Sequence, residues 1–174
     1  MESLPAEDAL FTFLETLGIA TKTVRHAPVF TVEEAQAARR GAEGGMPGWH
    51  TKNLFVRDKK KRRALVVAEE SVKIDLRTLA DHIGLGRVSF GSADSLRDML
   101  GVEPGSVTAF GLFNARVPEG EEPSLTVAID KTLLSGPVVN CHPLHNAATT
   151  AIAPDDLLKF IRACGYEPLI IDLS

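Results

Sequence analysis

Histidine, cysteine and asparagine side chains gather in residues 140–146, which read Asn-Cys-His-Pro-Leu-His-Asn directly after an apolar run. Polar groups are therefore concentrated where a strand is expected to end. Pro143 keeps His142 out of the α region, so the backbone there is extended or turned and aims the imidazole. Such a segment is typical of a pocket wall. The alternative is a buried turn whose polar side chains only satisfy backbone groups.

Two histidines and a cysteine also raise the question of zinc. Cys141, His142 and His145 include neighbours that would point to opposite faces of a strand, and no second pair of ligands with metal spacing occurs elsewhere. We therefore expect no metal. Nothing near Cys141 marks it as an activated thiolate, so we expect it to be a small core residue.

A second polar cluster, Thr51-Lys52-Asn53, follows a glycine-rich loop over residues 42–50. A lysine on a strand usually faces solvent. Together with His142 and Asn146, however, this cluster could line one pocket of hydrogen-bond donors that needs no metal. The sequence contains no Gly-x-Ser-x-Gly elbow, P-loop or dinucleotide fingerprint, which argues against acyl-enzyme chemistry and nucleotide hydrolysis.

A basic segment at residues 57–63 holds six of the 19 lysines and arginines of the chain. It lies at the expected tip of a hairpin. It is either a solvated turn that protects an edge strand or a finger that contacts phosphates. The formal net charge is −4, so nucleic-acid binding needs such a local patch. The candidate tRNA contacts are Lys59, Lys60, Lys61, Arg62 and Arg63.

Composition indicates one compact domain over residues 1–174, because 44% of the residues are hydrophobic and 24% are charged. There is no apolar run of membrane-spanning length, and the acidic start, Met-Glu-Ser-Leu-Pro-Ala-Glu-Asp, does not resemble a signal peptide. We expect a cytoplasmic protein that does not associate with membranes. The two cysteines do not make a disulfide framework.

Helix and strand signals alternate irregularly along the chain, which predicts an α/β or α+β fold with a mixed sheet. Asp75 and Ser92 are expected helix caps, and glycines follow the helices they begin. A capping box at Thr31–Glu34 predicts another short helix. One expected helix ends at Gly18, and the others cover residues 32–39, 76–82, 93–100 and 154–164. The expected strands cover residues 21–25, 51–56, 63–68, 87–90, 125–129, 149–152 and, as a buried strand, 168–173. Residues 107–113 are expected to form a strand or an irregular segment.

Three segments, 51–55, 104–112 and 141–149, resemble in order and spacing the YbaK/ProX-type family of trans-editing aminoacyl-tRNA deacylases. The resemblance spans nearly the whole chain. Within that family the sequence is most similar to the free-standing prolyl-tRNA editing proteins. It implies a mixed, partly barrel-like sheet with flanking helices. It also implies metal-independent, cofactor-free hydrolysis of the ester between a wrong amino acid, usually alanine, and tRNA(Pro).

The resemblance also assigns site residues. Lys52 corresponds to the essential lysine, and Ala109 stands where the family's substrate loop usually has proline, so we expect a less rigid loop. Mischarged tRNA is the implied partner, with prolyl-tRNA synthetase as a possible second one; no DNA partner is expected. The implied substrate-binding residues are Asn53, Gly105, Ser106, Val107, Thr108, His142 and Asn146.

The residues themselves leave two other functions open. A tRNA-binding module without catalysis would depend on the basic segment 57–63 alone. A hydrolase of a small acylated metabolite would use the same pocket and make no use of that segment. An aminoacyl ester is already activated, so a placed water and donors to the developing oxyanion are sufficient for its hydrolysis.

Overall fold

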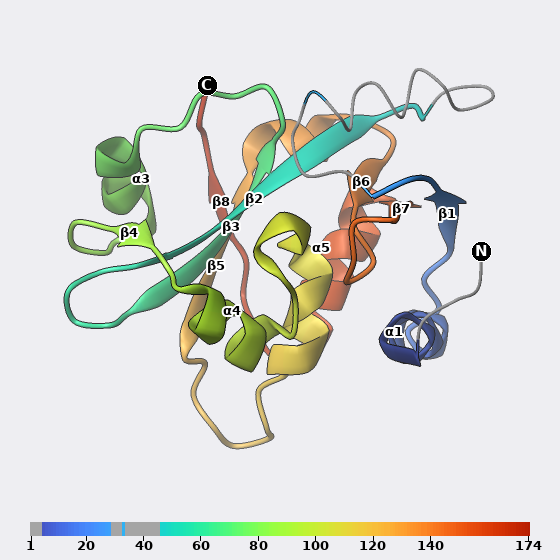
Figure 1. Cartoon of the computed structure of the whole chain (residues 1–174), viewed down its shortest axis with the longest axis horizontal. Coiled ribbons are helices and arrows are strands. Elements are labelled where there is room, and N and C mark those ends of the chain that lie inside the picture. Colours follow the sequence, from blue (N-terminus) through green and yellow to red (C-terminus); the bar gives the residue numbers. More distant parts are fainter. Residues whose placement is uncertain (1–4, 29–32, 34–45) are drawn as a thin grey trace.

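A mixed sheet forms the centre of the computed structural model, which describes residues 5–28, 33 and 46–174. Its strands are β1 (Thr21–Arg25), β2 (Trp49–Arg57), β3 (Arg63–Glu69), β4 (Ser89–Phe90), β5 (Leu125–Asp130), β6 (Val139–Cys141), β7 (Ala148–Ile152) and β8 (Leu169–Ile171). The order across the sheet is β1-β7-β6-β2-β3-β5-β8, with β4 also paired to β2 (Figure 1). The pairs β2–β6, β3–β5 and β5–β8 are parallel and the other pairs antiparallel, which confirms the mixed α/β prediction.

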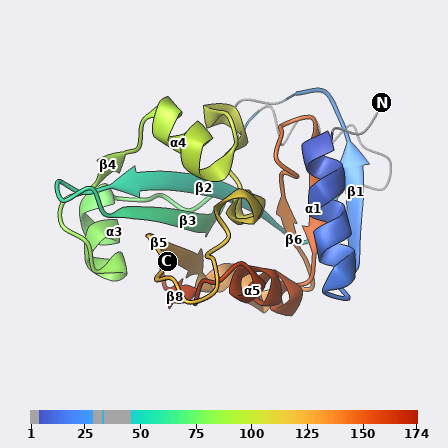
Figure 2. The same ribbon diagram turned by 90° about the horizontal axis from the view of Figure 1, so that it is seen from below.

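Helices flank this sheet at both ends, as predicted. Figure 2 shows α3 and β4 beside the tip of the β2–β3 hairpin and α1 at the opposite end, next to β1. The helices are α1 (Pro5–Thr16), α3 (Leu76–Ile83), α4 (Ala93–Leu100) and α5 (Pro154–Ala163), and the 3-10 segments are η1 (Pro104–Ser106), η2 (Ala109–Ala115) and η3 (Lys131–Ser135).

The predicted helix ends are confirmed by their hydrogen bonds. Asp75 caps α3 by accepting from the Arg77 amide at 2.9 Å, and Ser92 caps α4 by accepting from the Ser95 amide at 3.0 Å. Gly101 ends α4 in the left-handed conformation. These features are set by neighbours in the chain, which is why they can be predicted from local sequence.

Two apolar cores lie on the two faces of the central strands. The first core contains Phe55 and Val67 and is covered by α1, α4, η2 and α5. The second core contains Val56 and Val66 and is covered by α3 and β8. Side chains alternate between these cores along β2 and β3 because the side-chain period of a strand is two residues. Residues 64–68 of β3 are completely buried, so β3 is the centre of the domain.

One open prediction is decided by the structure, and two predicted element boundaries were wrong. For residues 107–113, where a strand or an irregular segment was expected, the structure excludes the strand: the Thr108 side chain caps the 3-10 segment η2. The loop predicted to reach His50 ends earlier, since Trp49 and His50 pair with β6. The last strand is shorter than 168–173 and is not buried throughout: Leu169 and Ile170 of this edge strand are 39% and 43% exposed.

Some predictions fall outside the described part of the chain. The capping box at Thr31–Glu34 and the helix over residues 32–39 belong to this group, apart from residue 33. Within the ranges 5–28 and 46–174, no helix is long and apolar enough to cross a bilayer.

Candidate functional site

The predicted polar pair Lys52 and Asn53 lies in the middle of β2, so the two side chains leave the strand on opposite faces. Lys52 shares its face with Leu54, which packs against the second core, and its ammonium donates a hydrogen bond to the Val72 carbonyl. Asn53 pairs with Val67 of β3 and faces the first core. The structure therefore places this lysine and this asparagine on opposite faces of the sheet, although they are adjacent in sequence.

The side-chain oxygen of Asn53 is buried and accepts no hydrogen bond from any residue that the structure describes. A buried carbonyl without a donor destabilises a fold by about 1–3 kcal/mol, so each such group needs an explanation. A bound ligand with an N–H or O–H group would provide the missing donor. Asn53 thus has the property required of a substrate-binding residue.

The loop that follows β6 is organised by backbone carbonyls. His142 Nδ1 lies 3.0 Å from the Ala148 carbonyl, so this nitrogen carries the proton and donates it. Burial lowers the pKa of His142, and the nearby His26 contributes to the lowering. The imidazole is therefore neutral at pH 7 and fixes the loop. Asn146 lies half-buried in the same loop.

The predicted substrate segment meets this loop. The buried Thr108 hydroxyl donates to the His142 carbonyl at 2.7 Å and accepts from the Phe110 amide at 3.2 Å. The Thr51 hydroxyl donates to the Asn140 carbonyl at 2.8 Å, which joins β2 to β6. The remaining members of the segment lie beside Thr108: Gly105 and a buried Ser106 in η1, then Val107 against the first core.

Thr108 offers a direct test of this contact. Thr108→Val keeps the shape but leaves the His142 carbonyl and the Phe110 amide without their partner, so we expect a loss of about 2 kcal/mol in the free energy of unfolding. Thr108→Ser retains the hydroxyl and should lose less than half as much. Urea denaturation measures both. A larger loss in Thr108→Ser than in Thr108→Val would show that the methyl group, and not the hydrogen bonds, carries the effect.

A buried ionic cluster anchors the same loop from the other side, and it was not predicted. The fully buried carboxylate of Glu7 on α1 accepts two hydrogen bonds from Arg25 on β1, at 2.8 and 2.9 Å. His145 Nε2 lies 2.8 Å from the same carboxylate. Partners this far apart in sequence leave no local signal, so only the fold reveals that Glu7 supports the loop.

Cys141 is a buried core residue, as predicted. Burial raises the pKa of its thiol to about 12, and a weaker opposing effect comes from a hydrogen bond with Thr51. The thiol is protonated at neutral pH and is no nucleophile. In residues 5–28 and 46–174, histidine, cysteine, aspartate and glutamate side chains form no group of three placed to hold a metal ion.

The basic segment is a defined turn at the tip of the β2–β3 hairpin. The nearly buried carboxylate of Asp58 accepts from the amides of Lys60, Arg62 and Gly86 at 2.9, 3.0 and 3.3 Å, and from Arg62 Nε at 2.7 Å. Burial alone would raise the pKa of Asp58, but the hydrogen bonds from Arg62 and Gly86 and the Arg62 charge outweigh it and lower the pKa. Arg62 is thus already paired, and Arg63 is half-buried beside Ser95.

The chain is similar to proteins of tRNA editing over nearly its whole length. A family model described as "Aminoacyl-tRNA editing domain" matches residues 26–160. The chain is 37% identical over 171 residues to "Prolyl-tRNA editing protein ProX" of Acetoanaerobium sticklandii, covering 98% of this chain and 99% of that protein. It is 34% identical to "Prolyl-tRNA synthetase associated domain-containing protein 1" of Danio rerio, covering 93% of this chain and 84% of that protein.

A solved structure has the same fold. It is described as a candidate trans-editing enzyme for prolyl tRNA synthetase, and it matches with a TM-score of 0.70 and 22% identity over 99% of both chains. The resemblance first inferred from three short segments is confirmed by these matches. The chain therefore belongs to the aminoacyl-tRNA editing domain family, whose members are aminoacyl-tRNA hydrolases.

Proposed function

We propose that this protein removes a wrong amino acid from tRNA(Pro) in trans, with alanine as its main target. The observation that carries this proposal is the full-length relation to a protein named as a prolyl-tRNA editing protein. The mischarged tRNA would come from prolyl-tRNA synthetase. The protein then acts as a separate step after release of that product.

The chemistry of selection explains why such a step is needed. A synthetase pocket that accepts proline excludes the smaller alanine poorly, because each missing methylene changes binding by only about 1–3 kcal/mol. A second pocket that accepts only the smaller side chain provides the missing discrimination. The half-buried Asn53 and the completely buried Thr108, both on the side of the first core, are our candidates for the lining of this pocket.

In the mechanism that we propose, the residues bind and orient an ester that is already reactive. The unpaired oxygen of Asn53 accepts a hydrogen bond from the α-amino group of the aminoacyl ester. A backbone amide of the segment Gly105–Thr108 donates to the carbonyl oxygen as negative charge develops there. The amide of Ser106 already donates to the Glu103 carbonyl at 2.8 Å, so this donor is another amide of the segment.

Lys52 and the loop after β6 have different tasks in this proposal. The Lys52 ammonium leaves the Val72 carbonyl and binds the phosphate of the 3′-terminal nucleotide of the tRNA. This contact places the ester for attack by water. The long, flexible stem of lysine makes such a movement possible. His142 is neutral and already donates to Ala148, and Asn146 lies in the same loop, so both shape the pocket and transfer no proton.

The test is a deacylation assay with a chelator present. We expect alanine to leave tRNA(Pro) at least about tenfold faster than proline does, since the pocket selects by side-chain size. Cysteinyl-tRNA(Pro) tests the selectivity for the amino acid, and alanyl-tRNA(Ala) tests the selectivity for the tRNA. Tight binding of tRNA with no ester cleavage would favour a binding module. Cleavage of free alanyl esters as fast as alanyl-tRNA(Pro) would favour a hydrolase of small metabolites.

A further inference from the structure

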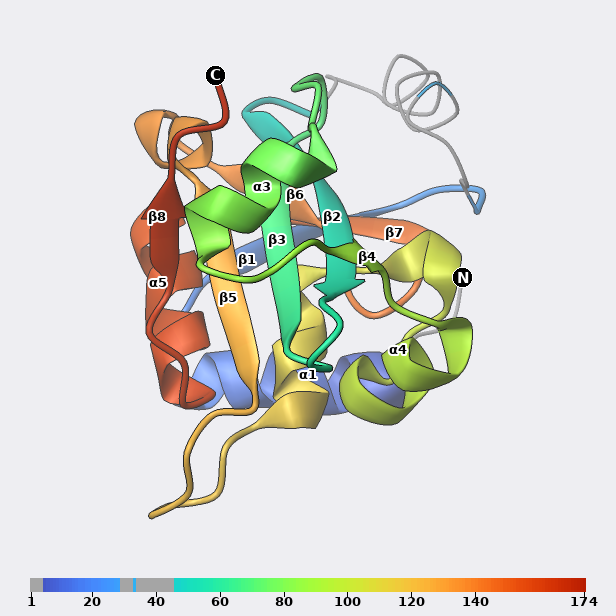
Figure 3. The same cartoon turned by 90° about the vertical axis from the view of Figure 1, so that its left-hand side faces the viewer.

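The basic turn has neighbours that the sequence does not place beside it. The short strand β4 pairs with the outer end of β2, so Ser89 lies opposite Arg57 and Phe90 opposite Val56. This pairing brings Arg87, just before β4, to the hairpin tip. The result is a continuous surface made from two separate segments of the chain, with β4 beside the end of β2 (Figure 3).

A cavity in this surface has the composition of an anion site. It measures about 260 Å³ and is lined by Arg57, Lys59 and Arg87, together with Ser89. Within the described ranges none of its three cations forms a salt bridge. Among the residues that the structure describes, the only carboxylate lining the cavity belongs to Asp58, whose oxygens already accept four hydrogen bonds from the turn and from Gly86.

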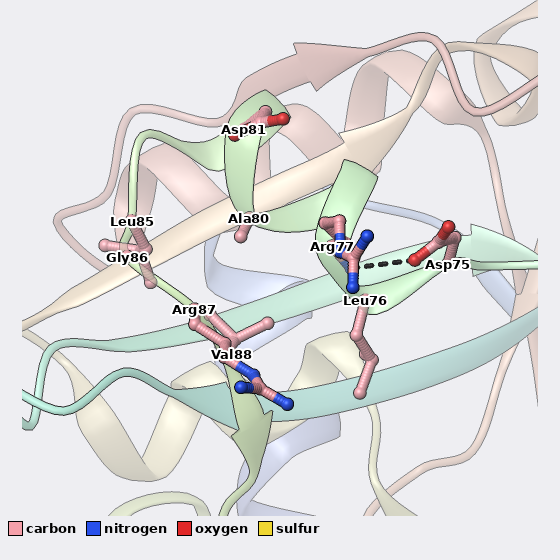
Figure 4. A pocket seen from close by; sticks show the side chains of 9 residues that line it. All are labelled: Asp75, Leu76, Arg77, Ala80, Asp81, Leu85, Gly86, Arg87 and Val88. Carbon is pink, nitrogen blue, oxygen red and sulfur yellow. Dashed lines mark hydrogen bonds between the residues drawn. The ribbon is translucent and has the colours of Figure 1, made fainter.

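The neighbouring cavity has a different charge balance. It measures about 760 Å³, and Figure 4 shows Arg77 and Arg87 on its wall together with the carboxylates of Asp75 and Asp81. Two cations and two anions give little net attraction for a phosphate. The smaller cavity, with three unpaired cations, is therefore the better anion site of these two.

The turn is held in shape before any ligand arrives. Its amides and the Arg62 guanidinium are fixed by Asp58, and Lys61 adopts a positive φ of 63° to close the turn. Lys59, Lys60 and Lys61 consequently project from a rigid base and are exposed. Binding through them loses less conformational freedom than binding through a disordered basic tail.

An exposed aromatic ring lies in β4, next to the cavity lining in sequence. Phe90 is 61% exposed, the most exposed large apolar side chain of the described residues. Phe90 follows Ser89 of the cavity lining in β4, and its pairing with Val56 directs its ring to the face of the strand opposite Arg57. An exposed ring near cations can stack on the base of an unpaired nucleotide whose phosphates those cations contact.

We propose that Arg57, Lys59 and Arg87 bind a phosphate group of RNA and that Phe90 stacks on an adjacent nucleotide, so that this surface docks the body of the substrate tRNA. The proposal rests on the proposed function for the identity of the RNA. Arg57 lies five residues along β2 from Lys52, which corresponds to roughly 17 Å. That distance suits a substrate whose aminoacyl end lies at Lys52 while its more distant nucleotides lie at the hairpin tip.

The main test compares two double charge reversals. The test variant combines Lys59→Glu with Arg87→Glu and changes the proposed site. The control variant combines Lys131→Glu with Lys159→Glu and changes the net charge by the same amount at exposed positions elsewhere. Each is assayed on alanyl-tRNA(Pro) and on a short alanylated CCA trinucleotide. We expect the ratio of kcat/KM for tRNA to that for the trinucleotide to fall at least about tenfold in the first variant only.

Binding of uncharged tRNA(Pro) provides a second readout that needs no catalysis. Losing this phosphate contact should make the slope of log Kd against log salt less steep by about 0.7 to 0.9. Phe90→Ala should weaken binding about tenfold, and Phe90→Trp should retain wild-type binding because it keeps a stacking ring.

The outcomes separate this proposal from the proposed function. Equal losses in the two double variants, or equal losses on tRNA and trinucleotide, would overturn the docking surface while leaving the deacylase intact. If wild type cleaves no ester, the proposed function fails, and the tRNA affinities and salt slopes alone decide the surface. If the Lys59→Glu, Arg87→Glu variant then bound tRNA with the wild-type Kd and the wild-type salt slope, the docking surface would be overturned too.

Discussion

Lys52→Ala is expected to lower kcat/KM for alanyl-tRNA(Pro) by at least about 100-fold, the usual effect of removing one well-placed charged or polar group from an active site. The loss arises because the ester is no longer positioned for attack by water. The lysine stem is half-buried and its ammonium contacts one carbonyl, that of Val72, so the fold should lose no more than about 1 kcal/mol.

Two controls make this result specific. Lys52→Met keeps most of the apolar stem and should be as inactive as Lys52→Ala, with unfolding closer to wild type. Lys52→Arg keeps the charge and should recover part of the activity, because guanidinium also binds phosphate but with a different shape. Normal turnover by Lys52→Ala would remove this lysine from the mechanism and with it the role that the family resemblance assigns.

Arg25→Met is expected to lower the free energy of unfolding by about 2–3 kcal/mol, which corresponds to roughly 4–12 °C in Tm for a chain of this size. Glu7 is completely buried, so losing the arginine leaves its carboxylate without the main compensating charge. The arginine side chain is 29% exposed, which places the expected loss below that of a fully buried pair.

A double-mutant cycle tests whether the pair acts as a unit. Glu7→Gln removes the charge but keeps the shape, so adding it to Arg25→Met should relieve part of the loss, with a coupling of at least about 1 kcal/mol. Strictly additive losses would show that the two residues stabilise the fold independently. Because His145 contacts the same carboxylate, editing activity should fall together with stability in Arg25→Met.

Local sequence determined many of the helix ends and turns of this protein. The caps at Asp75 and Ser92 and the β2–β3 hairpin all depend on residues close together in the chain, and each was predicted correctly. The family resemblance rested on short segments for the same reason, since chemistry at a site demands particular residue types at fixed local spacing. Turns compete with strands in apolar stretches, which is why local sequence left residues 107–113 open between a strand and an irregular segment.

Tertiary structure decided how these pieces combine. That Lys52 and Asn53 leave β2 on opposite faces follows from the period of a strand, but which core each face meets depends on α3 and η2 packing from different sides. The Glu7–Arg25–His145 cluster and the approach of Arg87 to the hairpin tip join residues distant in sequence. Burial and strand pairing select such contacts over the whole chain, so no local pattern predicts them.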